Sequence, residues 1–359
     1  MAAEYTPESV WAHVARMQAL YAGELKREIL VTFNNPPPKG FPSPGMFYPD
    51  TEKMFAAEMR RHSVRRQFVD DFFPSTGPWN TSMLIPAFLG AEPVYTRETG
   101  NLWVEPMPDL YDRLDDIRFN ENNRWLRATL DRYAHYKANL PGDCLLSIST
   151  QGPDDVAKEL RGTDLYFDFT DRPEAVKLLF MRVAQFLVQY RRRMLEAASR
   201  VAGGHINWQG FWVPDECFSM TVDAATNYSP QMFEEFTVPA INYIVEASGG
   251  FFDLHLEGSA MHILDCVKKL KGLLLLQYTN NPKLPRGIEV MDTLRSRLGD
   301  LPLFLLLTKR EFLEGMRQKC LAGNCIYAVG YDAEHLEDAV ESPGEAAEIM
   351  REAREYRAR

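Results

Sequence analysis

The feature that most constrains the fold is a regular alternation of short apolar runs and amphipathic helical segments after about residue 120. In the helix that opens at 171–174, for example, Val176, Leu179, Phe180 and Val183 fall on one helical face. Apolar strands separated by helices are typical of a parallel sheet covered by helices. We expect strands at residues 145–150, 205–209, 218–222, 251–255, 273–277, 301–307 and 325–329, and helices at residues 259–269, 287–298, 309–321 and 343–357.

With a further apolar run at 29–33, these units are enough for a closed barrel. The sequence therefore predicts an α/β fold of the (β/α)₈ TIM-barrel class, and a doubly wound open sheet is the alternative. A length of 359 residues fits one such barrel, which typically needs about 250 residues and tolerates insertions. No G-x-G-x-x-G follows a first strand, so we expect no nucleotide cofactor.

The first third of the chain is less regular. Residues 7–28 have the pattern of an amphipathic helix, capped by Thr6 and with Pro7 at its first position. From about residue 40 to 110 the chain is rich in Pro, Gly and aromatic residues, as in loops that wall a cleft. We expect one domain, 1–359, in which 1–120 form an N-terminal helical, loop-rich extension and 121–359 the regular β/α units.

Composition excludes several classes of protein. A net charge of −10 argues against nucleic acid as the main partner. No run approaches the roughly 20 apolar residues of a membrane span, and the first residues lack the pattern of a secretory signal. The five cysteines are scattered without C-x-x-C spacing, as in a reduced cytoplasmic protein. The oligomeric state stays open, a homodimer included.

In a TIM barrel the active site lies at the carboxyl ends of the strands. The strongest constellation there is His255-Leu256-Glu257-Gly258, since residues two apart on a strand point the same way. His255 and Glu257 are candidates for a metal site or for an acid/base pair. The alternative is a hydrogen-bonded histidine at the barrel mouth, with Glu257 capping the next helix.

Other polar and aromatic residues stand near expected strand ends. Asp223 is either a catalytic carboxylate or a group that satisfies loop amides. Tryptophans of the loops either form the floor of a flat ligand site or pack against the loops themselves. His205 and His262 are expected to have structural roles. The predicted substrate-binding residues are Asn34, Asn35, Trp79, Asn80, Trp208, Gln277 and Tyr278.

Several segments resemble the uroporphyrinogen decarboxylase superfamily, which also contains corrinoid-dependent methyltransferases. They include residues 87–92 and 103–106, the strand-to-helix joint at 162–176, and Asp223 followed by the helix start at 228–239. The element 255–258, with His262 and Gln277, is similar to a branch in which His-Leu-Asp-Gly replaces the zinc motif. The resemblance covers most of the chain and implies a TIM barrel.

The resemblance also implies a reaction. In the methyltransferases a His-x-Cys pair and a late cysteine bind zinc, which activates a thiol. In this chain those positions hold His255, Glu257 and Tyr331, so the implied site has oxygen ligands and would hold zinc or a harder metal. The implied partner is a corrinoid protein, and the implied substrate is a small methylated compound.

Three hypotheses follow. The first is an enzyme that moves a methyl group between a small methylated compound and a corrinoid protein, with His255, Glu257 and Asp223 at its centre. The second is a tetrapyrrole (uroporphyrinogen) decarboxylase, which needs a basic cleft, for instance from Lys39, Arg97 and Arg286. The third is a non-catalytic barrel that binds a small ligand or a partner protein.

Overall fold

The computed structural model describes residues 7–34, 41–79, 81–98, 100–330, 335 and 338–358. Its central element is a parallel sheet of six strands in the order β1-β13-β12-β11-β10-β9. The expected α/β fold with a parallel sheet is therefore confirmed. The strands are β1 (Ile29–Asn34), β9 (Cys217–Thr221), β10 (Phe251–Glu257), β11 (Leu273–Thr279), β12 (Leu303–Thr308) and β13 (Cys325–Gly330).

Two short strands, β2 (Ser75–Thr76) and β5 (Leu145–Leu146), form a second parallel pair. Among the described residues no strand ladder joins this pair to the six-stranded sheet. Individual hydrogen bonds bridge the two gaps. The Asp71 amide donates to the Val31 carbonyl at 3.0 Å beside β1, and the Thr150 hydroxyl donates to the Ser219 carbonyl beside β9.

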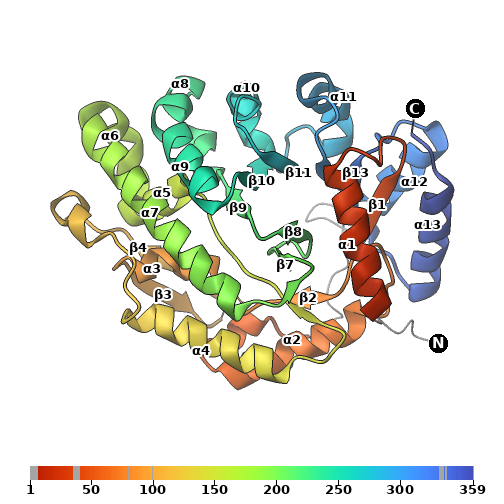
Figure 1. Ribbon diagram of the computed structural model, residues 1–359, viewed down its shortest axis with the longest axis horizontal. Helices are drawn as coiled ribbons and strands as arrows, with labels where there is room; N and C mark the ends of the chain where they lie inside the picture. Colours follow the sequence, from red (N-terminus) through yellow and green to blue (C-terminus); the bar gives the residue numbers. More distant parts are fainter. Residues whose placement is uncertain are drawn as a thin grey trace.

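Long helices surround the strands (Figure 1). Their ends follow ordinary capping chemistry: the Asn123 side chain accepts the amides of the first turn of α4, and Thr308 forms a capping box with Glu311. The long helices are α1 (Pro7–Tyr21), α2 (Thr51–Arg65), α4 (Arg124–Asn139), α5 (Pro153–Arg161), α7 (Pro173–Ala197), α9 (Val238–Ser248), α11 (Gly287–Leu298), α12 (Lys309–Gln318) and α13 (Pro343–Glu355).

The remaining helical segments are short, and η6 is a π-helical turn. Among the described helices none is both long and apolar enough to cross a membrane. The short segments are η1 (Pro44–Phe47), η2 (Ser82–Leu84), α3 (Ile85–Phe88), η3 (Leu110–Asp116), η4 (Gly162–Asp164), α6 (Leu165–Asp171), η5 (Asp223–Asn227), α8 (Pro230–Met232), η6 (Phe233–Thr237), η7 (Gly258–Ile263) and α10 (Leu264–Val267).

The strands separate two hydrophobic cores. Successive residues of a strand alternate between them: Leu276 belongs to the larger core with the covering helices, and Leu275 to a smaller core on the other face. The smaller core also contains Val14, Met17 and Leu20 of α1. Helix α1 therefore covers the face of the sheet that the other helices leave open.

Of the strand predicted at 205–209, only residues 205 and 206 are in a ladder, and they belong to a separate sheet rather than to the parallel one. Residues 200–214 form a small antiparallel sheet of β6 (Arg200–Val201), β7 (Gly204–Ile206) and β8 (Trp212–Pro214). The turn between β6 and β7 needs Gly203, which has φ +73°, and a Cβ at Gly204 would overlap Trp212. His205 is buried here and lies 3.6 Å from Asp215, in the structural role that we expected.

Several predicted boundaries shift. The N-terminal helix ends at Tyr21 rather than residue 28, because Gly23 adopts φ +69°. The predicted helix 259–269 is replaced by η7 and α10, and only Leu145–Leu146 of the predicted strand 145–150 is in a ladder. The stretch 40–110, expected to be irregular, contains α2 and a hairpin of β3 (Glu92–Thr96) and β4 (Asn101–Glu105).

Candidate functional site

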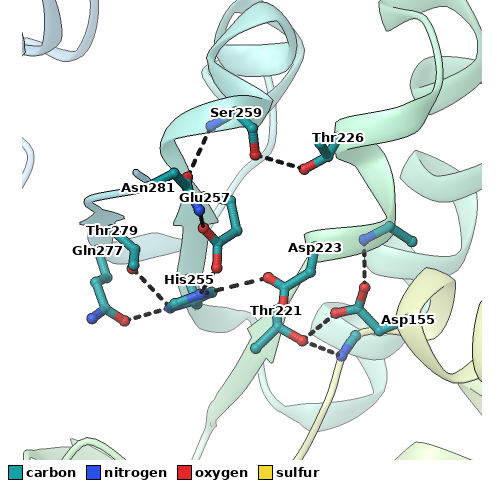
Figure 2. Close-up of polar contacts among 12 residues, drawn as sticks. Asp155, Thr221, Asp223, Thr226, His255, Glu257, Ser259, Gln277, Thr279 and Asn281 are labelled. Atoms are coloured by element: carbon teal, nitrogen blue, oxygen red, sulfur yellow. Dashed lines mark hydrogen bonds and ion pairs between the residues drawn. The ribbon is translucent and has the colours of Figure 1, made fainter. Parts of the chain in front are cut away.

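Strand β10 directs His255 and Glu257 to the same side, as their spacing predicts (Figure 2). Asp223 reaches them from η5, which follows the neighbouring strand β9. The Nε2 atom of His255 lies 3.4 Å from Glu257 Oε1 and 3.5 Å from Asp223 Oδ1. One ligand atom from each residue lies within 4.8 Å of the others. The three residues therefore form one cluster.

Amide side chains fix the imidazole of His255. Its Nδ1 donates to Gln277 Oε1 at 2.7 Å, and the same oxygen accepts Gln209 Nε2 at 2.5 Å. An oxygen that accepts from both sides requires a hydrogen on Nδ1. The lone pair of the neutral ring is then on Nε2, facing Glu257 and Asp223.

Glu257 is also held in place. Its second oxygen accepts the Asn281 amide, and Asn281 Oδ1 in turn accepts the backbone amide of Ser259 at 3.1 Å. Glu257 occupies the N-cap position of η7, but its side chain makes no capping hydrogen bond. The alternative in which Glu257 merely caps the next helix therefore does not describe this structure.

The electrostatics of the cluster favour a cation. Burial lowers the pKa of His255, but the carboxylates of Glu257 and Asp223 more than offset this and raise it above its ordinary value. When His255 is protonated, its Nε2 donates to Glu257, and this hydrogen bond lowers the pKa of Glu257. Desolvation and repulsion from Asp155 raise the pKa of Asp223 to about 7, although 51% of its side chain is exposed. A proton or a metal ion between these atoms relieves the repulsion.

Helix α5 supplies more carboxyl groups near Asp223. Asp154 and Asp155 are buried in the first turn of α5, and burial raises the pKa of each. Burial also raises the pKa of Glu159, one turn further on, to about 8. Asp154 accepts the Tyr228 hydroxyl at 2.8 Å. This side of the site is strongly acidic.

The donor set fits a divalent metal ion. Zinc with ligand bonds of about 2.0–2.1 Å places tetrahedral ligand atoms roughly 3.4 Å apart. The two separations from His255 Nε2, 3.4 and 3.5 Å, agree with this value. One imidazole nitrogen and two carboxylate oxygens suit zinc or a harder divalent metal. Held in this way, such an ion would keep open positions for a substrate atom.

A cavity of about 400 Å³ adjoins the cluster. Gln277 and Trp208 belong to both places: each lines the cavity, and the Trp208 ring lies edge-on to His255 with centroids 5.6 Å apart. Aromatic rings, including Phe72, Phe211 and Phe304, make up much of the wall. The described lining contains no Asp or Glu, and its one cation, Arg65, is paired with Asp70.

The structure brings together part of the predicted substrate site. Asn34, Trp208 and Gln277 all line the cavity. Trp79 packs beside Tyr48 instead, with ring centroids 6.1 Å apart. Tyr278 is buried on the opposite face of β11, where its hydroxyl donates to the Pro285 carbonyl at 2.5 Å. Asn35, Asn80 and Tyr331 lie outside the described residues.

Sequence reasoning missed four residues of this region. Asn281 follows the end of β11, so the strand-end rule that found Gln277 would also have found it. Gln209 sits in the turn between β7 and β8, and Arg65 ends α2 inside a stretch expected to be irregular. Asp155 lies on a helix, where acidic residues are usually solvated, and no pattern distinguishes it.

His262, as expected, has a structural contact, Nε2 to the Tyr228 carbonyl at 2.9 Å.

The cations that a polycarboxylate would need do not converge on the cavity. Arg286 is engaged by both oxygens of Glu311, and Arg97 is exposed in the β3–β4 hairpin. Neither lines the cavity, and Lys39 lies outside the described residues. The described part of the cavity therefore offers Arg65 alone to an anionic substrate.

Comparisons with known proteins give a fold but no family. No family model matches the chain, and no curated protein matches it. Among solved structures, the chain is similar to a methyltransferase from Methanosarcina mazei, with a TM-score of 0.60 and 14% sequence identity. The match covers 96% of this chain and 98% of that one. The chain thus shares its fold, over nearly its whole length, with that methyltransferase.

Proposed function

We propose that this protein is a metal-dependent methyltransferase that moves a methyl group between a small methylated compound and a corrinoid carried by a partner protein. His255, Glu257 and Asp223 are the proposed metal ligands, and Tyr331 is a proposed further one. Zinc is the metal that the resemblance implies, and a harder divalent ion suits the oxygen ligands equally well.

One observation carries the proposal. The Nε2 atom of His255 faces two carboxylates at 3.4 and 3.5 Å beside a cavity, while Nδ1 is held by an amide. The full-length match to the fold of a methyltransferase supports the choice of reaction class. Because one fold can host many functions, the assignment of the reaction depends on the chemistry of the cluster.

The roles of the residues follow from their positions. A bound divalent ion would act as a Lewis acid on the substrate heteroatom that carries or receives the methyl group. His255, Glu257 and Asp223 hold the ion, and Gln277 keeps the His255 ring oriented. Trp208 and the aromatic wall exclude water and orient the body of the substrate.

We also propose that the eight parallel strands form one closed barrel. Strands β2 and β5 would fill the space between β1 and β9, where the two bridging contacts lie. A closed ring would place the carboxyl ends of β9, β10 and β11 at one rim, as a TIM-barrel active site requires. The five cysteines are all free, which fits the expected cytoplasmic location.

Methyl transfer to and from free cobalamin tests the function. Purified protein loaded with zinc or manganese is mixed with methylcobalamin and a panel of small thiols, amines and phenols, and the cobalamin spectrum is followed. We expect demethylation with at least one acceptor, and none with His255→Ala. A metal-loaded protein that leaves methylcobalamin intact with every acceptor, and also fails to methylate cob(I)alamin from methylated donors, would contradict the proposal.

The same protein separates the rival functions. Conversion of uroporphyrinogen to less carboxylated products, followed by chromatography, would support the decarboxylase. Arg65, the single cation of the described lining, predicts that none occurs. Tight binding of a small ligand without turnover, unchanged in His255→Ala, would support the non-catalytic barrel.

A further inference from the structure

Two of the three residues of the cluster are held by amide side chains. His255 is fixed by Gln277, and Glu257 by Asn281. Among the described residues no amide side chain holds Asp223 in this way: it is half exposed in η5, and no side chain caps that turn. Something else must keep the Asp223 carboxylate directed toward His255.

Asp155 contacts the chain on both sides of Asp223 (Figure 2). One of its oxygens accepts the backbone amide of Ala224 at 2.7 Å, and the other accepts the Thr221 hydroxyl. The contacts span the residues from Thr221 to Ala224, so they fix the backbone that presents Asp223. Asp155 is only 6% exposed, and no described Lys or Arg forms an ion pair with it.

The helix that carries Asp155 is itself fixed against the end of β9. The Gly152 amide donates to Thr221 Oγ1 at 3.4 Å. A Cβ at Gly152 would lie 1.8 Å from the Thr221 carbonyl oxygen, so only glycine permits this approach. The start of α5 is therefore packed tightly against the end of β9, and this packing fixes the position of Asp155.

We infer that Asp155 is a positioning residue, which holds the turn after β9 so that Asp223 completes the metal-binding cluster with His255 and Glu257. The inference rests on the proposed function in so far as that function requires the metal. It assigns to a buried helix residue outside the proposed ligand set control over Asp223, the most exposed of these three ligands.

Metal titration of a set of variants tests the inference. Zinc and manganese are titrated separately into chelator-treated wild-type protein, Asp155→Ala, Asp223→Ala and the double variant, and bound metal is measured by equilibrium dialysis. Loss of a residue that orients a ligand typically costs about 10–100-fold in metal affinity. We expect Asp155→Ala to lose this much in the wild-type background, and less than about 2-fold where Asp223 is already alanine.

Two further variants guard against a general folding effect. Asp154→Asn alters the neighbouring buried acid, whose partner is Tyr228, and should leave metal affinity within about 2-fold of wild type. Thr221→Val removes one of the two Asp155 contacts and keeps the aspartate. It should lower affinity several-fold, again only while Asp223 is present, and it serves if Asp155→Ala fails to fold.

The outcomes separate the inference from the function beneath it. Wild-type protein that binds neither metal overturns the proposed function and the inference together. Wild-type protein that binds metal, with Asp155→Ala and Thr221→Val binding equally well, overturns the inference alone. If Asp155→Ala lowers metal affinity equally with and without Asp223, the inference is also overturned. Asp155 would then affect the metal site through the general stability of the fold.

Discussion

The cluster and the cavity beside it differ sharply in charge. Around β9, β10 and the start of α5, His255 stands among carboxyl groups: Glu257, Asp223, Asp155, Asp154 and Glu159. The described cavity lining has no carboxyl group, several aromatic rings, and a single cation that Asp70 neutralises. Gln277 lies between the two regions and contributes to both.

This difference indicates that the two regions have separate functions. The acidic region attracts a cation, and it repels an anionic substrate unless a cation is bound there. The cavity has the character of a site that selects a small molecule by shape and a few polar groups. We therefore expect changes in the acidic region to alter metal binding, and changes in the cavity lining away from Gln209 and Gln277 to alter substrate binding alone.

Replacing His255 by alanine should have the largest effect. It removes the nitrogen ligand and leaves Glu257 and Asp223 without the imidazole between them. We expect stoichiometric metal to be lost and transfer to become undetectable, while the circular dichroism spectrum stays that of the wild type. Metal retained at wild-type affinity would show that the acidic region is not the metal site.

Gln277→Ala should have the next largest effect. The substitution leaves Nδ1 of His255 with the longer contact to Thr279 Oγ1 at 3.4 Å, so the ring is held less firmly with Nε2 toward the carboxylates. We expect metal affinity to fall about 10–100-fold, with Gln209→Ala, one contact further away, losing less. A larger loss of metal affinity in Gln209→Ala than in Gln277→Ala would contradict the proposal that Gln277 orients His255 directly.

Filling the cavity should leave the metal untouched. Ala328 is a small residue of the lining, on β13, and a leucine there would occupy part of the 400 Å³. We expect Ala328→Leu to raise KM about 10-fold, which corresponds to about 1.4 kcal/mol of lost binding, with metal content unchanged. A drop in metal content with unchanged KM would reverse the assignment of the two regions.

The smallest effect is a dependence of stability on pH in metal-free protein. Asp223 and Glu159 have pKa values of about 7 and about 8, against about 4 in an unfolded chain. Between those values the folded chain binds more protons, so the free energy of unfolding falls as pH rises through this range. Glu159→Gln should flatten the fall between about pH 6 and about pH 8 in urea unfolding. An unchanged slope in that variant would count against the acidic cluster as its source.

Sequence patterns predicted the fold better than the surroundings of the site. Strand β10 and helices α7 and α11 were found because their apolar periodicity is strong and uninterrupted. Residues 205–209 were assigned to the parallel sheet, but β7 and the turn after it pack into the smaller core without joining that sheet. Helix α2 was missed because Pro- and Gly-rich neighbours obscure its pattern.

The same limit applies to the site. His255 and Glu257 were predicted together because strand geometry directs alternate residues to one side. Strand-end reasoning also found Asp223, but its approach to His255 depends on the packing of β9 against β10. Gln209 and Asp155 reach the site from a turn and a helix far apart in the chain, and only tertiary contacts reveal them.

The central claim is that His255, Glu257 and Asp223 hold a metal ion, and elemental analysis tests it most directly. Protein is purified without chelators beside a His255→Ala/Glu257→Ala double variant, and the metal content of each is measured. We predict about one divalent ion per wild-type chain and none in the variant. Metal absent from both samples, or equal in both, would contradict the account and leave His255 and Glu257 as an acid/base pair or as simple ligand contacts.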